Sequence, residues 1–116
     1  MFIRRLLAAS AVAVLWSSTL VASPASAALS QCNSYNGWLC TWTSTGYSGT
    51  FAVSYPSYIG DCMTMATTAR SAWNRTNYYV YWWTSSNCSG GEFESWGSNV
   101  RSDLSATARS FKFTTQ

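Results

Sequence analysis

The chain has 116 residues and no histidine, and its seven Lys or Arg against four Asp or Glu give a formal net charge of +3. Only 9% of the residues are charged and the basic ones form no cluster, so an electrostatic basis for binding nucleic acid is missing. Because there is no histidine to act as a base and nothing beside the many serines could activate them, the sequence also argues against an enzyme.

The first 27 residues have the pattern of a secretory signal peptide. Arg4 and Arg5 precede an apolar run over residues 6–21, and Ala25-Ser26-Ala27 is a small-x-small cleavage site. The run is too short and too interrupted for a membrane span, which needs roughly 20 apolar residues. The arginine pair also matches part of a twin-arginine signal, although ordinary secretion is favoured. We therefore expect a secreted protein whose single domain, residues 28–116, makes no contact with a membrane.

All four cysteines lie in that domain. An even number of cysteines in a short exported chain indicates two disulfides, for which three pairings exist. We favour Cys32–Cys40, which closes a short loop before the first expected strand, and Cys62–Cys88, which ties the two halves of the domain together. Each bond should stabilise the fold by about 2–4 kcal/mol. A zinc site is disfavoured because there is no CxxC pair and no histidine, so neither a metal nor a cofactor is expected.

From residue 38 onward, short runs rich in aromatic and β-branched residues alternate with Gly, Ser and Asn. No run sustains the apolar period of a helix, so the sequence predicts an all-β fold. The expected strands are Trp38–Ser44, Thr50–Tyr55, Tyr78–Thr84, Glu92–Trp96 and Arg109–Thr114.

One segment of the chain is written nearly twice. WTSTGYSGT at residues 42–50 returns as WTSSNCSGG at residues 83–91, and each copy is followed at nearly equal spacing by a TARS sequence, at residues 68–71 and 107–110. Two matched motifs at one offset predict a duplicated unit of about 40 residues, spanning about 36–76 and about 77–116, whose halves pack on each other.

Each copy has a local interpretation. Gly49 and Gly90 stand where the chain must fold sharply back, a place where a Cβ atom is costly. Tyr47 follows Trp42 closely enough for one ring to cover the hairpin of the other. Cys88 occupies the equivalent position in the second copy, where we expect a disulfide to hold the turn instead.

An aromatic-x4-aromatic-x-Gly pattern followed by a serine-containing segment resembles the Greek-key motif of the βγ-crystallin superfamily, here present twice. A closer resemblance is to the secreted actinobacterial peptidase inhibitors typified by the Streptomyces metalloproteinase inhibitor. It implies a secreted bacterial protein folded as a βγ-crystallin-like sandwich of two Greek-key motifs with about eight strands, and we expect a monomer. The matching residues are Cys32 with Asn36–Cys40, Tyr47–Gly49, Ala69–Ser71, Asn74–Thr76, Tyr78–Trp83 and Ala108–Phe111.

The resemblance also implies a substrate-like loop that occupies the active site of a metallopeptidase. By position, this inhibitory loop comprises Ser86, Asn87, Cys88, Ser89 and Gly90, and the expected partner is a secreted peptidase. The chain departs from the family pattern here, because Cys88 has no near cysteine neighbour and the following Ser-Gly-Gly offers no hydrophobic side chain.

Calcium binding, which is common in βγ-crystallins, is not expected. The acidic pair of the calcium motif is missing from both copies, and Arg70 and Arg109 stand at the first serine position of the motif. We expect these arginines to pair with Glu92, Glu94 or Asp103.

Three other features keep alternatives open. The strand at residues 78–84 carries large side chains on both faces: Tyr78, Val80 and Trp82 on one, Tyr79, Tyr81 and Trp83 on the other. The second set is either covered, which we favour, or exposed for stacking on sugar rings, as in a cell-wall or chitin-binding antimicrobial or toxin-like module. Glu92 and Glu94 are expected on one solvated strand face rather than as a glycosidase pair. Asn74-Arg75-Thr76 is expected to form a turn rather than a glycosylation site.

Overall fold

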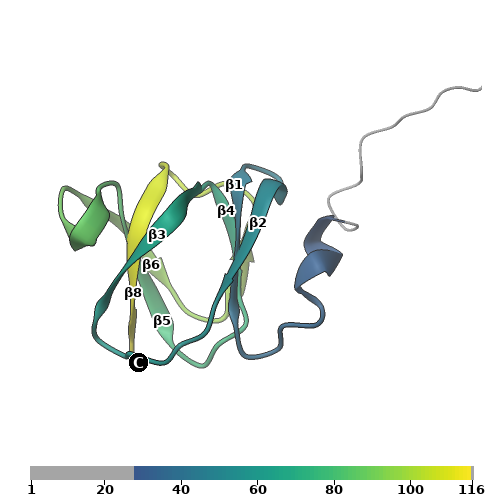
Figure 1. Cartoon of the computed structure of the whole chain (residues 1–116), viewed down its shortest axis with the longest axis horizontal. Coiled ribbons are helices and arrows are strands. Elements are labelled where there is room, and N and C mark those ends of the chain that lie inside the picture. Colours follow the sequence, from purple (N-terminus) through teal and green to yellow (C-terminus); the bar gives the residue numbers. More distant parts are fainter. Residues whose placement is uncertain (1–27, 116) are drawn as a thin grey trace, which may run out of the picture.

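A computed structural model describes residues 28–115 of the chain, so the expected signal peptide lies outside the described residues. Eight strands form two four-stranded antiparallel sheets that pack face to face (Figure 1). The strands are β1 (Leu39–Ser44), β2 (Ser48–Ser54), β3 (Cys62–Ala69), β4 (Ser71–Asn74), β5 (Tyr79–Trp83), β6 (Glu92–Trp96), β7 (Asn99–Arg101) and β8 (Ala108–Thr114), with single 3-10 turns η1 (Ser30–Cys32) and η2 (Ser86–Cys88).

The order of the strands repeats between the two sheets. Sheet A has the order β2-β1-β4-β7 and sheet B the order β3-β8-β5-β6. Adding four to each strand number of sheet A, and continuing from β8 to β1, gives β6-β5-β8-β3. This is the order of sheet B read in reverse. The halves interlock because β3 and β7 each join the sheet of the other half. The expected all-β sandwich of two Greek-key motifs is thus confirmed.

Three strands were not predicted from the sequence. Strand β3 has the sequence CMTMATTA, with no aromatic residue, and β4 and β7 are only four and three residues long. These strands form by pairing with a neighbouring strand. Strand β3 pairs with β8, where Met63 lies opposite Phe111, and β7 pairs with β4, where Val100 lies opposite Trp73. Pairing partners far along the chain decide these short strands, since local propensity is weak in them.

The main core lies between the sheets. Trp82 is fully buried, and its ring centroid lies 5.8 Å from that of Trp96 and 5.7 Å from that of Phe111. Burying a large apolar side chain contributes about 1.5–3 kcal/mol, so these rings supply much of the stability of the sandwich. The buried residues of this core are Leu39, Ala69, Ala72, Val80, Trp82, Trp96, Leu104, Ala108, Phe111 and Phe113.

A second cluster lies on the outer face of sheet A. It joins Cys32, Cys40, Trp42 and Tyr47, and the segment at residues 28–38 packs over it (Figure 1). The indole Nε1 of Trp42 donates a hydrogen bond to Gln31 Oε1 at 2.8 Å, and the Cys32–Cys40 disulfide fastens the segment to β1. The fully buried Trp42 is therefore covered from outside the sandwich.

Candidate functional site

The two copies of the repeated segment form corners with the same hydrogen bonds. In the first corner the Ser71 hydroxyl donates to the Ser44 carbonyl at 2.7 Å and accepts from the Tyr47 N–H at 3.0 Å. In the second corner, which precedes β6, the Ser110 hydroxyl donates to Ser85 O at 2.6 Å and accepts from Cys88 N–H at 2.9 Å. A serine from the last strand of each motif thus holds the first turn of that motif.

The corner glycines have matched roles as well. Gly49 and Gly90 have φ angles of +86° and +76°, a region that other residues rarely adopt. A Cβ atom on Gly49 would lie 2.2 Å from Thr43 Oγ1, and one on Gly90 would lie 2.7 Å from Ser85 Oγ. Both turns therefore require glycine for its φ and for its missing side chain.

The corners differ in what holds their tips. The Tyr47 ring meets Trp42 edge to face, with centroids 5.2 Å apart, and burial raises the pKa of the Tyr47 hydroxyl. In the second corner Cys88 takes the equivalent place and forms a disulfide with Cys62. The two disulfides, Cys32–Cys40 and Cys62–Cys88, are the pairs that the sequence analysis favours.

The expected inhibitory loop, residues 86–90, projects from sheet B at one side of the sandwich (Figure 1). Ser86, Asn87, Ser89 and Gly90 are exposed and Cys88 is half-buried. The Asn87 N–H donates to Thr64 Oγ1 at 3.0 Å, and the Thr84 N–H donates to Gly91 O at 3.1 Å across the base of the loop. With the disulfide to β3, these contacts fix the loop in one conformation.

The centre of this loop is not extended. Asn87 and Cys88 have φ angles of 60° and 52°, in the left-handed region, while the flanking Ser85 and Ser89 are extended. A peptide that adds to a strand of a binding cleft does so in an extended conformation. The loop therefore presents a compact turn with small polar side chains rather than a substrate-like strand.

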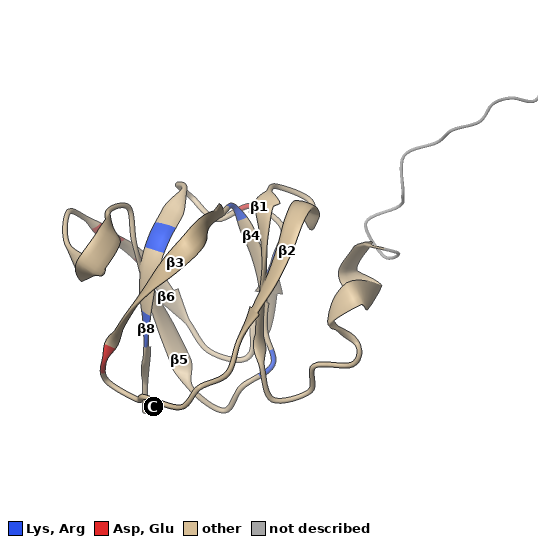
Figure 2. Cartoon of the chain, in the orientation of Figure 1, with Lys and Arg blue, Asp and Glu red and all other residues tan. Residues whose placement is uncertain are grey.

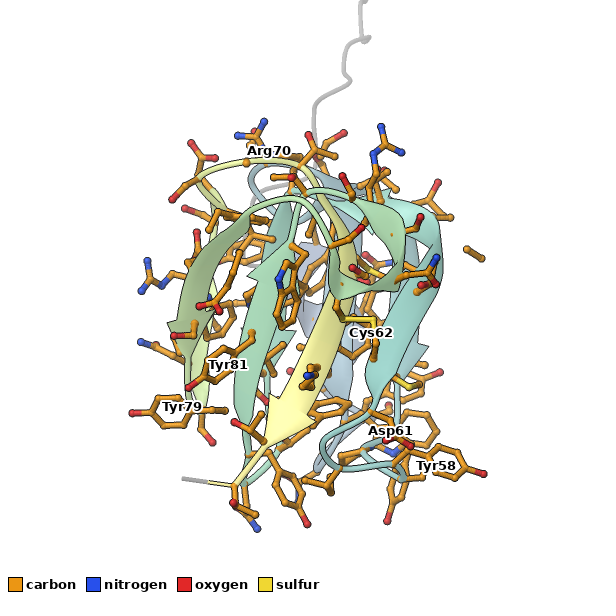
Figure 3. All side chains as sticks on the ribbon, turned by 90° about the vertical axis from the view of Figure 1, so that its left-hand side faces the viewer. Tyr58, Asp61, Cys62, Arg70, Tyr79 and Tyr81 are labelled. Carbon is orange, nitrogen blue, oxygen red and sulfur yellow. A yellow bond between two sulfur atoms is a disulfide. The ribbon has the colours of Figure 1, made fainter. Side chains whose placement is uncertain are left out.

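The three outward side chains of β5 are neither covered nor fully exposed. Tyr79, Tyr81 and Trp83 are half-buried on the outer face of sheet B, and Figure 3 shows Tyr79 and Tyr81 pointing away from the body of the protein. The Tyr81 and Trp83 rings are nearly parallel, with centroids 6.4 Å apart and planes at 27°, and Lys112 Nζ lies 5.6 Å from the Trp83 centroid. This face differs from that of sheet A, where the covering segment buries Trp42 completely.

Charged residues are sparse and scattered over the domain (Figure 2). Arg70 pairs with Asp103 at 2.6 Å, as the sequence analysis expected. Glu94 Oε2 instead accepts from the N–H and the hydroxyl of Ser105, at 2.8 and 2.9 Å. Arg109 is exposed and forms no ion pair within residues 28–115. Over the same residues, no three Cys, Asp or Glu side chains are grouped in a way that could hold a metal ion.

The expectation that Glu92 and Glu94 share one solvated strand face is wrong. Glu94 pairs with Trp82, which faces the core, whereas Glu92 pairs with Trp83, which faces outward. The irregularity between these pairs makes Phe93 an extra residue in β6, and such a bulge shifts the following side chains to the other face. The Glu94 side chain is accordingly only 11% exposed.

Asn74 ends β4 and its side chain closes an Asx turn over Arg75 and Thr76, so the expected turn forms around the side chain of Asn74 at the end of a strand. Asn74 is 1% exposed, and its Nδ2 donates to Tyr78 O at 2.9 Å. Its Oδ1 accepts from the N–H and the hydroxyl of Thr76, at 2.9 and 2.6 Å. The buried Asn74 amide is thus occupied by hydrogen bonds to Thr76 and Tyr78, as expected for a structural residue rather than a glycosylation site.

The hollows formed by residues 28–115 include a groove and a surface depression. A groove of about 260 Å³ lies between the free edges of β2 and β3, and its lining of Thr, Ser, Ala, Val, Met and Phe includes no ionisable side chain. A hollow of about 300 Å³ lies beside Tyr55, Arg75 and Tyr78. Neither brings a carboxylate close to a base or a nucleophile, so neither resembles a catalytic centre.

The connection between β2 and β3 was not predicted as a functional segment, yet this connection carries the exposed large apolar side chains of the described residues. Tyr55 is 56% exposed, Tyr58 63% and Ile59 37%. Figure 3 shows Tyr58 at the outer edge of the protein, near Asp61. The available signal was the apolar content of a segment, SYPSYIGD, that the strand pattern assigned to a loop.

A family model described as peptidase inhibitor family I36 matches residues 25–95. The chain belongs to this peptidase inhibitor family. The matched segment includes β1 to β5, the loop at residues 86–90 and most of β6. No curated protein and no solved structure matches the chain.

Membership of peptidase inhibitor family I36 indicates an inhibitor of peptidases rather than an enzyme. The two disulfides fit an extracellular protein, because such bonds persist in oxidising compartments. Between residues 28 and 115, no helix has the length and apolar content needed to cross a membrane.

Proposed function

We propose that this protein is secreted and inhibits an extracellular metallopeptidase, and that the loop at residues 86–90 forms part of the contact surface. The match to peptidase inhibitor family I36 carries the proposal, and the matched residues include this loop. The exposure of Ser86, Asn87, Ser89 and Gly90 supports the location.

The fixed shape of the loop supports tight binding. Ordering a flexible loop on binding costs affinity, and a loop already held in one conformation avoids that cost. Here the Cys62–Cys88 disulfide, the Asn87–Thr64 hydrogen bond and the Ser110 hydroxyl attach the loop at three points to the neighbouring strands β3 and β8. Because Asn87 and Cys88 are left-handed, we propose that the loop meets the peptidase as a rigid surface and does not thread through the active site.

Inhibition assays on the purified, oxidised protein test the proposal. Hydrolysis of a chromogenic peptide is measured for metallo-, serine, cysteine and aspartic peptidases with increasing inhibitor. We expect saturable inhibition of a metallopeptidase. If micromolar protein slows no peptidase of any class, the proposed function is wrong, and inhibition of serine peptidases alone would change the target class.

A matched pair of variants tests the loop. Thr45 and Ser86 occupy equivalent exposed positions in the first and second corners. The Ser48 hydroxyl donates to the Thr45 carbonyl at 2.7 Å, and the Ser89 hydroxyl donates to the Ser86 carbonyl at 2.8 Å. Ser86→Arg places a long charged side chain in the proposed contact and should raise Ki about tenfold or more, which corresponds to about 1.4 kcal/mol. Thr45→Arg makes the same change in the other corner and should leave Ki unchanged. Equal Ki values for the two variants would remove the loop from the contact surface.

The outer face of sheet B supports a second candidate, binding of a polysaccharide. Its basis is the nearly parallel pair Tyr81 and Trp83, which is half-buried; among residues 28–115, no segment covers this pair as residues 28–38 cover Trp42 on sheet A. Aromatic rings combine apolar faces with polar groups at their edges, which suits stacking on sugar rings. Retention on chitin or cell-wall material that Tyr81→Ala abolishes would favour this function, particularly if no peptidase is inhibited.

A further inference from the structure

The connection between β2 and β3 exposes large apolar side chains without an evident structural need. Tyr58 is 63% exposed and Ile59 is 37% exposed, and the two are adjacent at a turn. Exposed apolar side chains gathered in one place commonly mark an interaction site. In the described part of the chain, the large hydrophobic residues that are exposed are these two and Tyr55, all on the same connection.

The turn that carries Tyr58 and Ile59 is held rigidly. The Asp61 N–H donates to Tyr58 O at 3.2 Å, which closes a β-turn with Gly60 at its third position, where φ is +91°. The Gly60 N–H donates to Phe113 O at 2.7 Å and so attaches the turn to the end of β8. Cys62, immediately after the turn, is held by its disulfide.

The start of the connection is anchored too. The Tyr55 ring lies against Trp38, with centroids 5.1 Å apart, and the Ser57 N–H donates to Tyr55 O at 2.9 Å. Pro56 between them has a fixed φ. Unlike Asn87 and Cys88, none of residues 55–59 has a left-handed backbone.

This turn leads directly into β3, the strand that is bonded to the loop at residues 86–90. The Cys62–Cys88 disulfide joins the two with Cα atoms 5.8 Å apart, and Thr64, two residues further along β3, hydrogen-bonds Asn87. In Figure 3, the labelled residues Tyr58, Asp61 and Cys62 follow one another from the lower right-hand edge towards the middle of the face turned to the viewer. The turn exposes the apolar side chains of Tyr58 and Ile59, whereas the loop at residues 86–90 exposes only small polar residues and glycine.

We infer that the Tyr58-Ile59 turn supplies the side chains that fill the apolar specificity pocket of the peptidase, while the loop at residues 86–90 contacts the rim. This inference rests on the proposed function. Two adjacent apolar side chains at the tip of a rigid turn form a projecting element, and peptidase clefts are concave sites with apolar lining. Asp61 is the only charged residue of the connection, so little charge would have to be desolvated on entry.

Variants of the turn test the inference in the same Ki assay. Tyr58→Ala should raise Ki about 30-fold or more, equivalent to about 2 kcal/mol, the usual threshold for a dominant contact. Ile59→Ala should also raise Ki, and Tyr58→Phe should retain inhibition because the ring remains. The matched control is Tyr79→Ala, which removes a tyrosine from the outer face of sheet B. Urea unfolding of each variant checks that the fold is intact, as expected for side chains so exposed.

The outcomes separate the two proposals. If the unmodified protein inhibits a peptidase but Tyr58→Ala and Ile59→Ala change Ki less than about twofold, the inference is overturned and the proposed function stands. If the unmodified protein inhibits none, both fall. Two further results would identify a different occupant and overturn the inference: dimerisation in sedimentation that Tyr58→Ala abolishes, or retention on chitin that Tyr58→Ala abolishes.

Discussion

Replacing the corner serines with alanine should destabilise the protein by different amounts in its two motifs. The fully buried Ser71 hydroxyl bridges the Tyr47 N–H and the Ser44 carbonyl. Ser71→Ala therefore removes both hydrogen bonds and leaves the buried Tyr47 N–H without a partner, whereas water can reach the carbonyl of the exposed Ser44. An unpaired buried donor costs about 1–3 kcal/mol, so we expect a loss of about 2–3 kcal/mol.

Ser110→Ala should lower the free energy of unfolding less, by about 1–2 kcal/mol, because the Cys88 N–H and the Ser85 carbonyl that the hydroxyl bridges form only partly buried hydrogen bonds. The disulfide of Cys88 also continues to hold the second corner. Ser48→Ala and Ser89→Ala serve as controls, because each removes an exposed hydrogen bond and should cost no more than about 0.5 kcal/mol.

The measurement is urea unfolding followed by tryptophan fluorescence, with both disulfides intact. Midpoints should shift without a change in slope, because the surface exposed on unfolding is unchanged. In a domain of this size, each 1 kcal/mol should lower Tm by about 4–8 °C. A loss of stability for Ser71→Ala no larger than that for Ser48→Ala, or a larger loss for Ser110→Ala than for Ser71→Ala, would show that burial of the Tyr47 N–H does not set the cost.

Two further predictions concern the first corner. Gly49→Ala should cost about 2–4 kcal/mol, because its positive φ is strained for alanine and the new Cβ displaces Thr43 Oγ1 from its 2.8 Å hydrogen bond with Thr50 N–H. Gly37→Ala, with φ +90° but open space around the Cβ, should cost only about 1–2 kcal/mol; equal losses in urea unfolding would contradict this account. Burial raises the pKa of Tyr47 above 10.0, so the folded protein holds the hydroxyl proton more tightly than the unfolded chain does. The contribution of this group to the free energy of unfolding is therefore complete below pH 10.0, and it is lost as the pH rises through the folded pKa. Tm measured from about pH 8 to about pH 11 should therefore fall more steeply for the unmodified protein than for Tyr47→Phe, and parallel curves would argue against a buried hydroxyl.

Much of the candidate site could be located from the sequence, but its shape could not. The resemblance placed a loop at residues 86–90, and the structure shows that segment exposed and held by a disulfide. The left-handed backbone of Asn87 and Cys88 was not predicted. It recurs at Gly46 and Tyr47 in the first corner, with φ angles of 69° and 59°, but Cys and Tyr rarely adopt this region, so the residue types gave no local signal for it. The bulge that separates Glu92 from Glu94 likewise arises from the register between β5 and β6.

The all-β class, the matched corners and the disulfide-linked halves followed from the sequence alone. The order of residues marks these features directly, through the repeated glycine that takes a positive φ, the repeated TARS segment, the even number of cysteines and the runs of aromatic and β-branched residues. The crossing of β3 and β7 to the opposite sheets, and the covering of Trp42 but not of Trp83, emerged only from the three-dimensional arrangement. The same is true of the exposure of Tyr58 and Ile59 on the connection that leads to Cys62, the disulfide partner of Cys88. Pairing and exposure depend on which distant segments meet, and the local pattern of residues does not contain that information.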